Sequence, residues 1–132
     1  MKLKGFILLV SLFIFSCEKR PVNGKLEGRW QLMNVSYLYD EEVWNPEFTY
    51  YDFTLNLLQL ARTGNSEFST QSEWARFNHT DDSIHIYMIG STSRKARLFG
   101  MNDTIQHFEI EVLTGKNMIL QSSFAKLKFR KF

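Results

Sequence analysis

Two stretches of sequence, GRWQLMNVSYL at residues 28–38 and FAKLKFRKF at residues 124–132, indicate the fold class. Apolar and polar side chains alternate along both stretches, which is the pattern of a β-strand with one face in a core. Trp30 begins the apolar face of the first stretch. Leu127 and Phe129 lie on the apolar face of the second, opposite lysine and arginine side chains. Both ends of the domain are therefore predicted to be β-strands.

The chain between these ends contains further strand-like segments separated by turn residues. Residues 48–61 predict one long strand with a bulge near residues 57–58, or a strand that ends in a short helix, because the apolar pattern changes face there. Residues 92–99 interrupt the alternation and allow one short helix before Gly100. The remaining predicted strands cover residues 72–79, 83–89, 104–113 and 118–122.

This pattern predicts an all-β fold of about seven or eight short strands in an antiparallel meander. Closing the meander into a small barrel would remove the exposed edges that a flat sheet leaves. The large side chains expected to point inward are Phe53, Leu55, Phe108, Ile110, Leu120 and Phe129. Eight-stranded barrels range from filled to holding one small ligand, so the pattern leaves open whether this barrel is hollow.

The first residues of the chain, MKLKGFILLVSLFIFSC, differ from everything that follows. Lys2 and Lys4 precede an apolar run of about ten residues, which suits an export signal and is too short to span a bilayer. The run ends at Cys17, the only cysteine in the chain, and resembles the lipobox of bacterial lipoproteins of the Bacteroidetes type. That resemblance implies cleavage before Cys17 and acylation of this residue. Several acyl chains would then hold the protein on a membrane.

These features divide the chain into a signal peptide at residues 1–16, a lipidated tether at residues 17–25 and one domain at residues 26–132. Loss of Lys2 and Lys4 with the signal leaves the mature chain without net charge. A neutral chain gives no electrostatic reason to expect a nucleic-acid partner. The single cysteine, once acylated, leaves no thiol for disulfide bonds or metal clusters.

Both ends of the predicted domain resemble those of lipocalins. Gly28-Arg29-Trp30 is similar to the Gly-x-Trp motif that opens a lipocalin barrel. Lys128 and Arg130 stand in the last strand, where lipocalins place a basic residue across that tryptophan. The ending FEIEVLTGKNMILQSSFAKLKFRKF also resembles small lipocalin-like lipoproteins of Bacteroidetes. The resemblance implies a lipocalin-like (calycin-type) barrel that Gly28, Trp30 and Arg130 help to close.

The polar residues do not form a recognisable catalytic or metal-binding motif. The densest group is His79, Asp81, Asp82 and His85, but strand alternation does not require both histidines to face one side, and paired aspartates are typical of turns. The sequence contains no nucleophile elbow, phosphate-binding glycine loop or zinc-protease motif. We therefore expect no enzymatic activity, no metal and no cofactor.

Aromatic residues form the candidate ligand-binding site. Trp44, Phe48, Tyr50 and Tyr51 crowd the segment that follows the first predicted strand. In a lipocalin-like barrel this segment lies over the open end, where these rings, together with Trp74, could line an apolar mouth. The alternative is that they plug the barrel and complete its core.

Two functions remain open at this point. The first is binding of a small apolar or amphipathic ligand by a monomeric lipoprotein of the cell envelope, anchored in the outer membrane with the periplasmic face favoured. The alternative is a non-enzymatic structural or interaction module, with a filled barrel, that binds another envelope protein. A cavity of roughly 300 Å³ or more inside the barrel would favour the first.

The lipid anchor leads to a direct prediction. Cys17→Ala should leave the chain uncleaved or free of the membrane, without an acyl label, because the thiol that carries the lipid is gone. Metabolic labelling with a fatty acid, followed by detergent partitioning, measures this. Release of the wild-type protein from membranes without detergent would contradict the prediction.

Overall fold

The computed structural model describes residues 23–63 and 70–132, and most of their regular structure is β-strand. The strands are β1 (Gly28–Tyr37), β2 (Val43–Trp44), β3 (Thr49–Thr54), β4 (Leu57–Arg62), β5 (Gln71–His79), β6 (Ser83–Ile89), β7 (Ile105–Leu113), β8 (Asn117–Gln121) and β9 (Ala125–Lys131). The helical elements are single turns, η1 (Gly24–Leu26), α2 (Ser93–Ala96) and η2 (Arg97–Phe99). Within the two described ranges no helix has the length and apolar character needed to cross a membrane.

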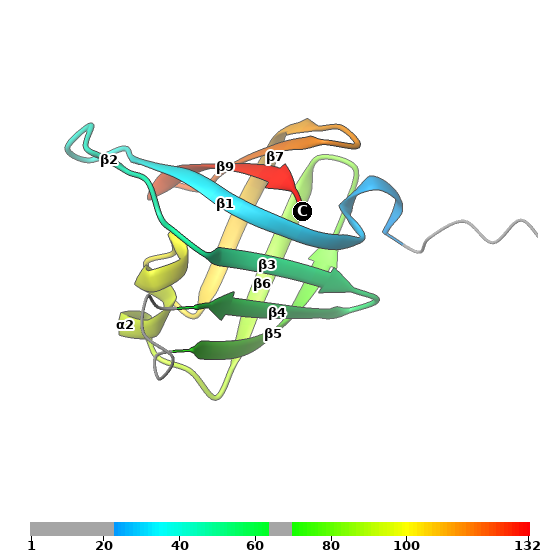
Figure 1. The fold of residues 1–132 in the computed structure, drawn as a ribbon, viewed down its shortest axis with the longest axis horizontal. Coiled ribbons are helices and arrows are strands. Elements are labelled where there is room, and N and C mark those ends of the chain that lie inside the picture. Colours follow the sequence, from blue (N-terminus) through cyan, green and yellow to red (C-terminus); the bar gives the residue numbers. More distant parts are fainter. Residues whose placement is uncertain (1–22, 64–69) are drawn as a thin grey trace, which may run out of the picture.

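The strands form one antiparallel sheet that closes on itself (Figure 1). From β3 to β9 each strand pairs with the next, while β1 pairs with β3 on one side and β9 on the other. The two-residue β2 pairs with β1 beyond β3, opposite Val35 and Ser36. Eight strands thus make the barrel wall, which confirms the predicted all-β meander that closes into a barrel. The predicted short helix is also confirmed as α2 followed by η2, which ends at Gly100.

The pairing of β1 with β9 closes the barrel around Trp30, which is fully buried. The Trp30 indole Nε1 donates a hydrogen bond of 2.9 Å to the carbonyl oxygen of Leu26 in η1. The Lys131 ammonium lies 4.5 Å from the centroid of a Trp30 ring, within the range of a cation–π interaction. Lys131 also donates to the carbonyl oxygen of Glu27, so the last strand is tied to the segment that precedes the first.

The basic residue across Trp30 is therefore Lys131, whereas the sequence had suggested Arg130. In β9 the inner face carries Leu127 and Phe129, both buried, and alternation places Lys131 on that same face. Arg130 lies on the outer face, where its Nε donates to Gln31 at 3.0 Å. Neither Lys128 nor Arg130 lies across Trp30, because both fall on the outer face of β9, one position away from the inner residues.

Residues 48–61 form two strands instead of the single strand that was predicted. A tight turn of two residues, Leu55 and Asn56, joins β3 to β4, and Thr54 pairs with Leu57. Leu55 has a φ angle of 57° and is 59% exposed, so it does not point inward as expected. Such turns usually contain glycine or asparagine in left-handed conformations, and a leucine at that position concealed the hairpin. The change of face comes from this turn and not from a bulge.

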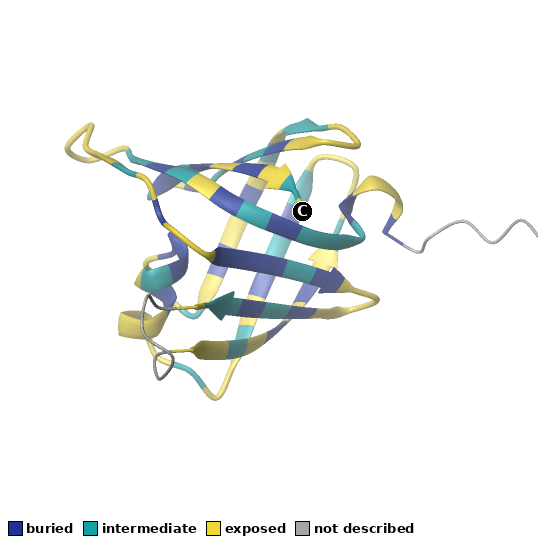
Figure 2. Ribbon diagram, viewed as in Figure 1, coloured by how far each residue is buried: buried dark blue, intermediate teal, exposed yellow. Residues whose placement is uncertain are grey.

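Buried residues recur along every strand of the barrel wall (Figure 2), and their side chains form one hydrophobic core. The largest fully buried side chains include Trp30, Tyr51, Phe53, Phe99 and Phe108. Of the residues predicted to point inward, Phe53, Phe108, Leu120 and Phe129 are buried. Ile110 is only half-buried, since the β7–β8 register shifts between Ile110 and Val112.

Trp30 offers a test of the closure. We predict that Trp30→Ala lowers the free energy of unfolding by about 3–5 kcal/mol, as large-to-small aromatic changes in cores do, and that it also leaves Lys131 without the ring. Urea unfolding followed by circular dichroism measures the change. Trp74→Ala is the matched control, because Trp74 is 49% exposed on the outside of β5. This control should cost about 1 kcal/mol or less, and an equal loss in both variants would contradict the closure role of Trp30.

Candidate functional site

The end of the barrel opposite η1 is the mouth, and residues 92–101 lie across it as a cap. Phe99 and Met101 in the cap are fully buried. The hydroxyl group of Tyr51, which points inward from β3, donates to the carbonyl oxygen of Phe99. Burial raises the pKa of Tyr51, so this hydroxyl keeps its proton and remains a donor. A hydrogen bond from β3 therefore holds the cap in place.

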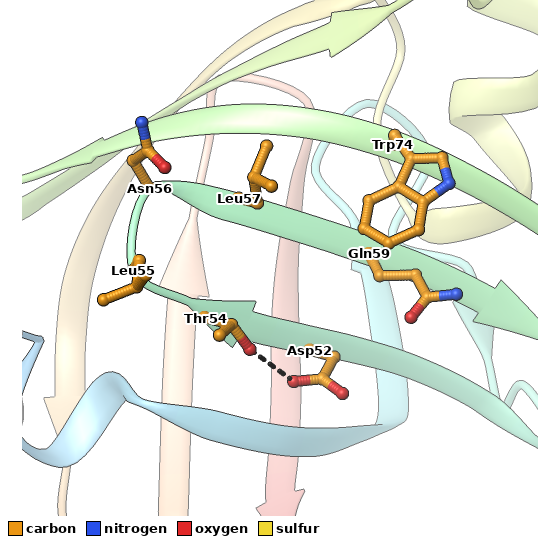
Figure 3. A pocket seen from close by; sticks show the side chains of 7 residues that line it. All are labelled: Asp52, Thr54, Leu55, Asn56, Leu57, Gln59 and Trp74. Atoms are coloured by element: carbon orange, nitrogen blue, oxygen red, sulfur yellow. Dashed lines mark hydrogen bonds between the residues drawn. The ribbon is translucent and has the colours of Figure 1, made fainter.

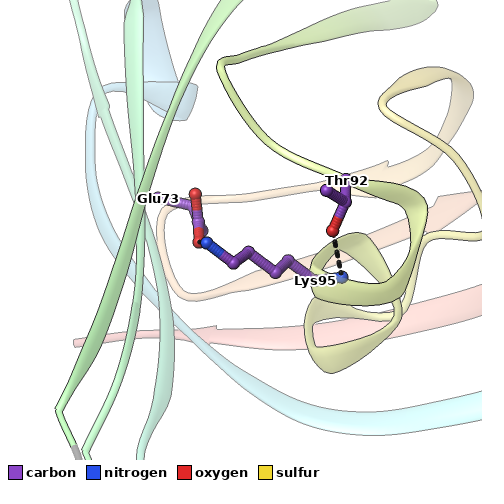
Figure 4. A network of polar contacts seen from close by, with 3 residues as sticks. All are labelled: Glu73, Thr92 and Lys95. Carbon is purple, nitrogen blue, oxygen red and sulfur yellow. Dashed lines mark hydrogen bonds and ion pairs between the residues drawn. The ribbon is translucent and has the colours of Figure 1, made fainter.

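An ion pair and a helix N-cap also hold the first residues of the cap segment, residues 92–95 (Figure 4). The Lys95 ammonium of α2 lies 3.3 Å from the carboxylate of Glu73, which has little exposed side-chain area at the top of β5. The hydroxyl of Thr92 accepts the backbone N–H of Lys95 at 3.3 Å, and a threonine oxygen in this position is a standard helix N-cap. Gly100 ends η2 with a φ angle of 80°. A Cβ at this position would lie 3.2 Å from the side chain of Leu127.

The five aromatic residues proposed from sequence to line the mouth do not come together. Tyr51 is in the core, and Trp44 is half-buried against the core, with the guanidinium of Arg62 5.9 Å from its ring centroid. Tyr50 belongs to the outer side of the wall, where it is covered by other side chains. Phe48 is 46% exposed, and Trp74 projects from the outside of β5.

Tyr50 has its own partners on that outer side. The guanidinium carbon of Arg29 lies 4.3 Å from the Tyr50 ring centroid, and the ring of Phe132 packs edge-on at 5.1 Å. Alternation along β3 explains the arrangement, since Tyr51 and Phe53 take the inner positions. Tyr50 and Tyr51 therefore face opposite sides of the wall, which neighbours in one strand must do.

A different aromatic group surrounds the rim of the mouth. Tyr37, Tyr39 and Phe124 have ring centroids 5.3–5.8 Å apart, and with Arg97 they line a hollow of about 430 Å³. Burial, followed by the charges of neighbouring groups, raises the pKa of Tyr37. Sequence reasoning missed this group because its members come from three separate segments. Only closure of the barrel brings these segments together.

An apolar hollow lies on the outside of the wall, over β3, β4 and β5 (Figure 3). It has a volume of about 310 Å³. This outer groove is lined by Asp52, Thr54, Leu55, Asn56, Leu57, Gln59 and Trp74. Leu57 and Trp74 are 41% and 49% exposed, so large apolar side chains face solvent there.

Exposed apolar side chains continue from the outer groove onto β6. Ile89 is the cross-strand partner of Trp74 and is 48% exposed. Tyr87, 41% exposed, is the partner of Arg76, which in turn lies opposite Leu57. Directly opposed residues in antiparallel strands have Cβ atoms about 4.5–5.5 Å apart, so Trp74 and Ile89 are neighbours, while Arg76 lies between Leu57 and Tyr87.

Leu55, at the edge of the outer groove, is held in a strained conformation by residues near η1. We call this end of the barrel, opposite the mouth, the base. The carbonyl oxygen of Leu55 accepts a 2.7 Å hydrogen bond from the side chain of Asn23, which is buried. Its backbone N–H donates to the carboxylate of Glu27 at 3.3 Å. Asn23 also shows that residues 23–25, predicted to belong to the tether, are part of the folded domain. A leucine in the left-handed region costs about 1–2 kcal/mol, and such strain persists where the surroundings enforce it.

The chain was compared with known proteins. Residues 9–132 match the family model of the lipocalin-like domain. A lipocalin-like protein from Bacteroides uniformis is 20% identical, with a TM-score of 0.71 over 83% of this chain and 100% of its own. An uncharacterized protein from Bacteroides eggerthii is 25% identical, with a TM-score of 0.67 over 80% of this chain and 98% of its own. No curated protein matches the chain. The predicted resemblance is confirmed, and the chain belongs to the family of lipocalin-like domains.

Proposed function

We propose that this protein is an interaction module that binds another protein of the cell envelope through its outer groove. The observation that carries the proposal is the strained Leu55, which stands exposed at one end of the outer groove, with Leu57 next to it and Trp74 at the other end, instead of serving the core (Figure 3). Hydrophobic residues spaced singly on a surface need no explanation, but a continuous apolar surface marks an interaction site. Strain retained at such a surface adds a second reason to assign it a function.

The barrel interior supports this reading over a central ligand site. Lipocalin-like barrels that hold a ligand need room between their inner side chains. Here Trp30, Tyr51 and Phe53 occupy the interior, and Phe99 enters it from the cap. The cap is fixed by the Tyr51 hydrogen bond and the Lys95–Glu73 ion pair, both of which would have to break before a ligand could enter.

The side chains in and around the outer groove indicate which groups a partner should present. The groove volume of about 310 Å³ suits one or two apolar side chains, and Trp74 is the type of residue that dominates binding energy at protein interfaces. The amide and hydroxyl groups of Asn56, Gln59 and Thr54 offer hydrogen bonds around it. Arg76, between Leu57 and Tyr87, has no ion-pair partner among the described residues. The partner should therefore present an apolar side chain next to a carboxylate.

The proposal includes anchoring in the envelope through Cys17. The signal at residues 1–16 and Cys17 lie outside the described residues, so this part rests on the sequence alone. Asn23, the first described residue, lies at the base next to the Leu55 turn. A chain anchored shortly before it would hold the outer groove close to the membrane surface, within reach of other envelope proteins. Acylated Cys17, no cofactor and no enzymatic activity remain our expectations.

A small amphipathic ligand at the rim of the mouth is a second candidate function, which the hollow beside Tyr39, Phe124 and Arg97 favours. We predict that a fluorescent anilinonaphthalene sulfonate then binds the protein with one site, and that Arg97→Ala or Tyr39→Ala removes binding without loss of stability, because both residues are exposed. Fluorescence titration measures it. Unchanged binding in Arg97→Ala and Tyr39→Ala, or binding lost instead in Trp74→Ala, would assign the probe to another surface.

Photo-crosslinking tests the main proposal. A benzoyl-phenylalanine at position 57, in cells of the native host, should give one discrete adduct with an envelope protein. Arg76→Glu should remove this adduct, because the partner's carboxylate is then repelled. The same photoreactive residue at position 128, exposed on β9, is the matched control and should give none. Adducts only with lipid, or only with a second copy of this chain, would contradict the proposal.

A substitution at Leu55 allows the contributions of this residue to stability and to binding to be measured separately. We predict that Leu55→Gly raises the free energy of unfolding by about 1 kcal/mol, because glycine adopts a positive φ without strain. The same variant should weaken the crosslink, because the exposed leucine side chain is lost. Urea unfolding and the crosslinking yield are the two measurements. A variant that gains stability and keeps the full yield would show that Leu55 does not contact the partner.

A further inference from the structure

Two histidines from distant parts of the sequence meet on the outer wall. His85 on β6 and His107 on β7 are cross-strand partners. Their Nδ1 atoms are 3.1 Å apart, and their ring centroids are 4.3 Å apart. The sequence had grouped His85 with His79 instead. On β5, however, Ala75 and Phe77 face the interior, which puts His79 on the inner side, and Asn78 is the residue opposite His85.

The short distance between the two Nδ1 atoms suits two arrangements. In the first, one neutral ring carries its proton on Nδ1 and donates it to the lone pair of the other. In the second, both Nδ1 lone pairs bind one metal ion. Two nitrogens that bind the same zinc ion at about 2.0–2.1 Å are about 2.9 Å apart at a right angle and about 3.3 Å apart at the tetrahedral angle. The observed 3.1 Å lies between these values.

The surroundings of the pair suit a cation and leave room for further ligands. A hollow of about 300 Å³ adjoins His107 and is also lined by Glu109 and Gln121. Asp82, at the start of β6, is close enough to His107 for their charges to interact. No group of three or more histidine, cysteine, aspartate or glutamate side chains able to hold a metal occurs in residues 23–63 and 70–132. The remaining coordination positions are therefore left to water.

We propose that His85 and His107 form a two-imidazole site that binds a divalent transition metal ion through both Nδ1 atoms. Imidazole nitrogen is a ligand of intermediate softness that suits Zn²⁺ and Cu²⁺. Affinity at such a site rises from Zn²⁺ to Cu²⁺ in the usual order of these metals. A metal there links β6 to β7 across the wall, in addition to their backbone hydrogen bonds.

Titration of the full-length protein in detergent with Cu²⁺ and with Zn²⁺ tests the site. All variants carry Cys17→Ser, which removes the only thiol. Calorimetry should show one ion per chain, bound more tightly for Cu²⁺. Either His85→Asn or His107→Asn should weaken binding by roughly 10²-fold or more, because the second ligand then no longer binds within the same molecule. His79→Asn, which changes the only other histidine, should leave the affinity unchanged.

Electron paramagnetic resonance of the Cu²⁺ form supplies a readout that a purely structural role of the histidines would not change. The spectrum should show hyperfine splitting from two imidazole nitrogens in the parent and from one in His107→Asn. Absence of binding for both metals would overturn the proposal and leave the pair as a shared hydrogen bond. Binding that survives both His85→Asn and His107→Asn, or that depends on His79, would equally overturn it.

Discussion

Closure of the sheet between β1 and β9 is the constraint on which the whole molecule depends. Lys131 reaches Glu27, 104 positions away in the chain, and the same ammonium lies over the ring of Trp30. Burial lowers the pKa of Lys131, although Glu27 and Asp52 oppose that shift. The cost of burying this ammonium is therefore only partly offset by the two carboxylates. The other pairings join strands that are next to each other in sequence or, for β1 and β3, separated only by the short β2, and only β1 and β9 come from opposite ends of the sheet.

The inner and outer faces of the barrel wall carry different kinds of side chains. The inner face of the wall is committed to aromatic packing, with Tyr51 in contact with Phe53, Phe99 and Phe129. The outer face keeps Leu57, Trp74 and the histidine pair in solvent. A strand has two faces, and here one provides stability while the other remains free to change without loss of the core.

Strand alternation predicted the fold class, the meander, the helix near Gly100 and most inner residues, because these follow from local pattern. The β3–β4 hairpin escaped prediction, since its turn contains Leu55 in a conformation usually taken by glycine. Lys131 was missed because the basic residue was carried over from the lipocalin resemblance, although alternation from Phe129 leads to Lys131. The sequence could not predict the rim hollow, the outer groove or the histidine pair. Their members belong to different strands, and only the three-dimensional pairing shows which residues become neighbours.

Among the described elements, the closing strand β9 is the last to be synthesised. Until β9 is available, β1 has one unpaired edge, and β8 has another. Open edges of this kind accept a strand from any chain that offers one. Contacts across so many residues also form slowly, since the loop between them must close first. At high local concentration, β9 of one molecule can complete the barrel of another. The pairing of β1 with β9 is therefore also the place where two chains can exchange strands.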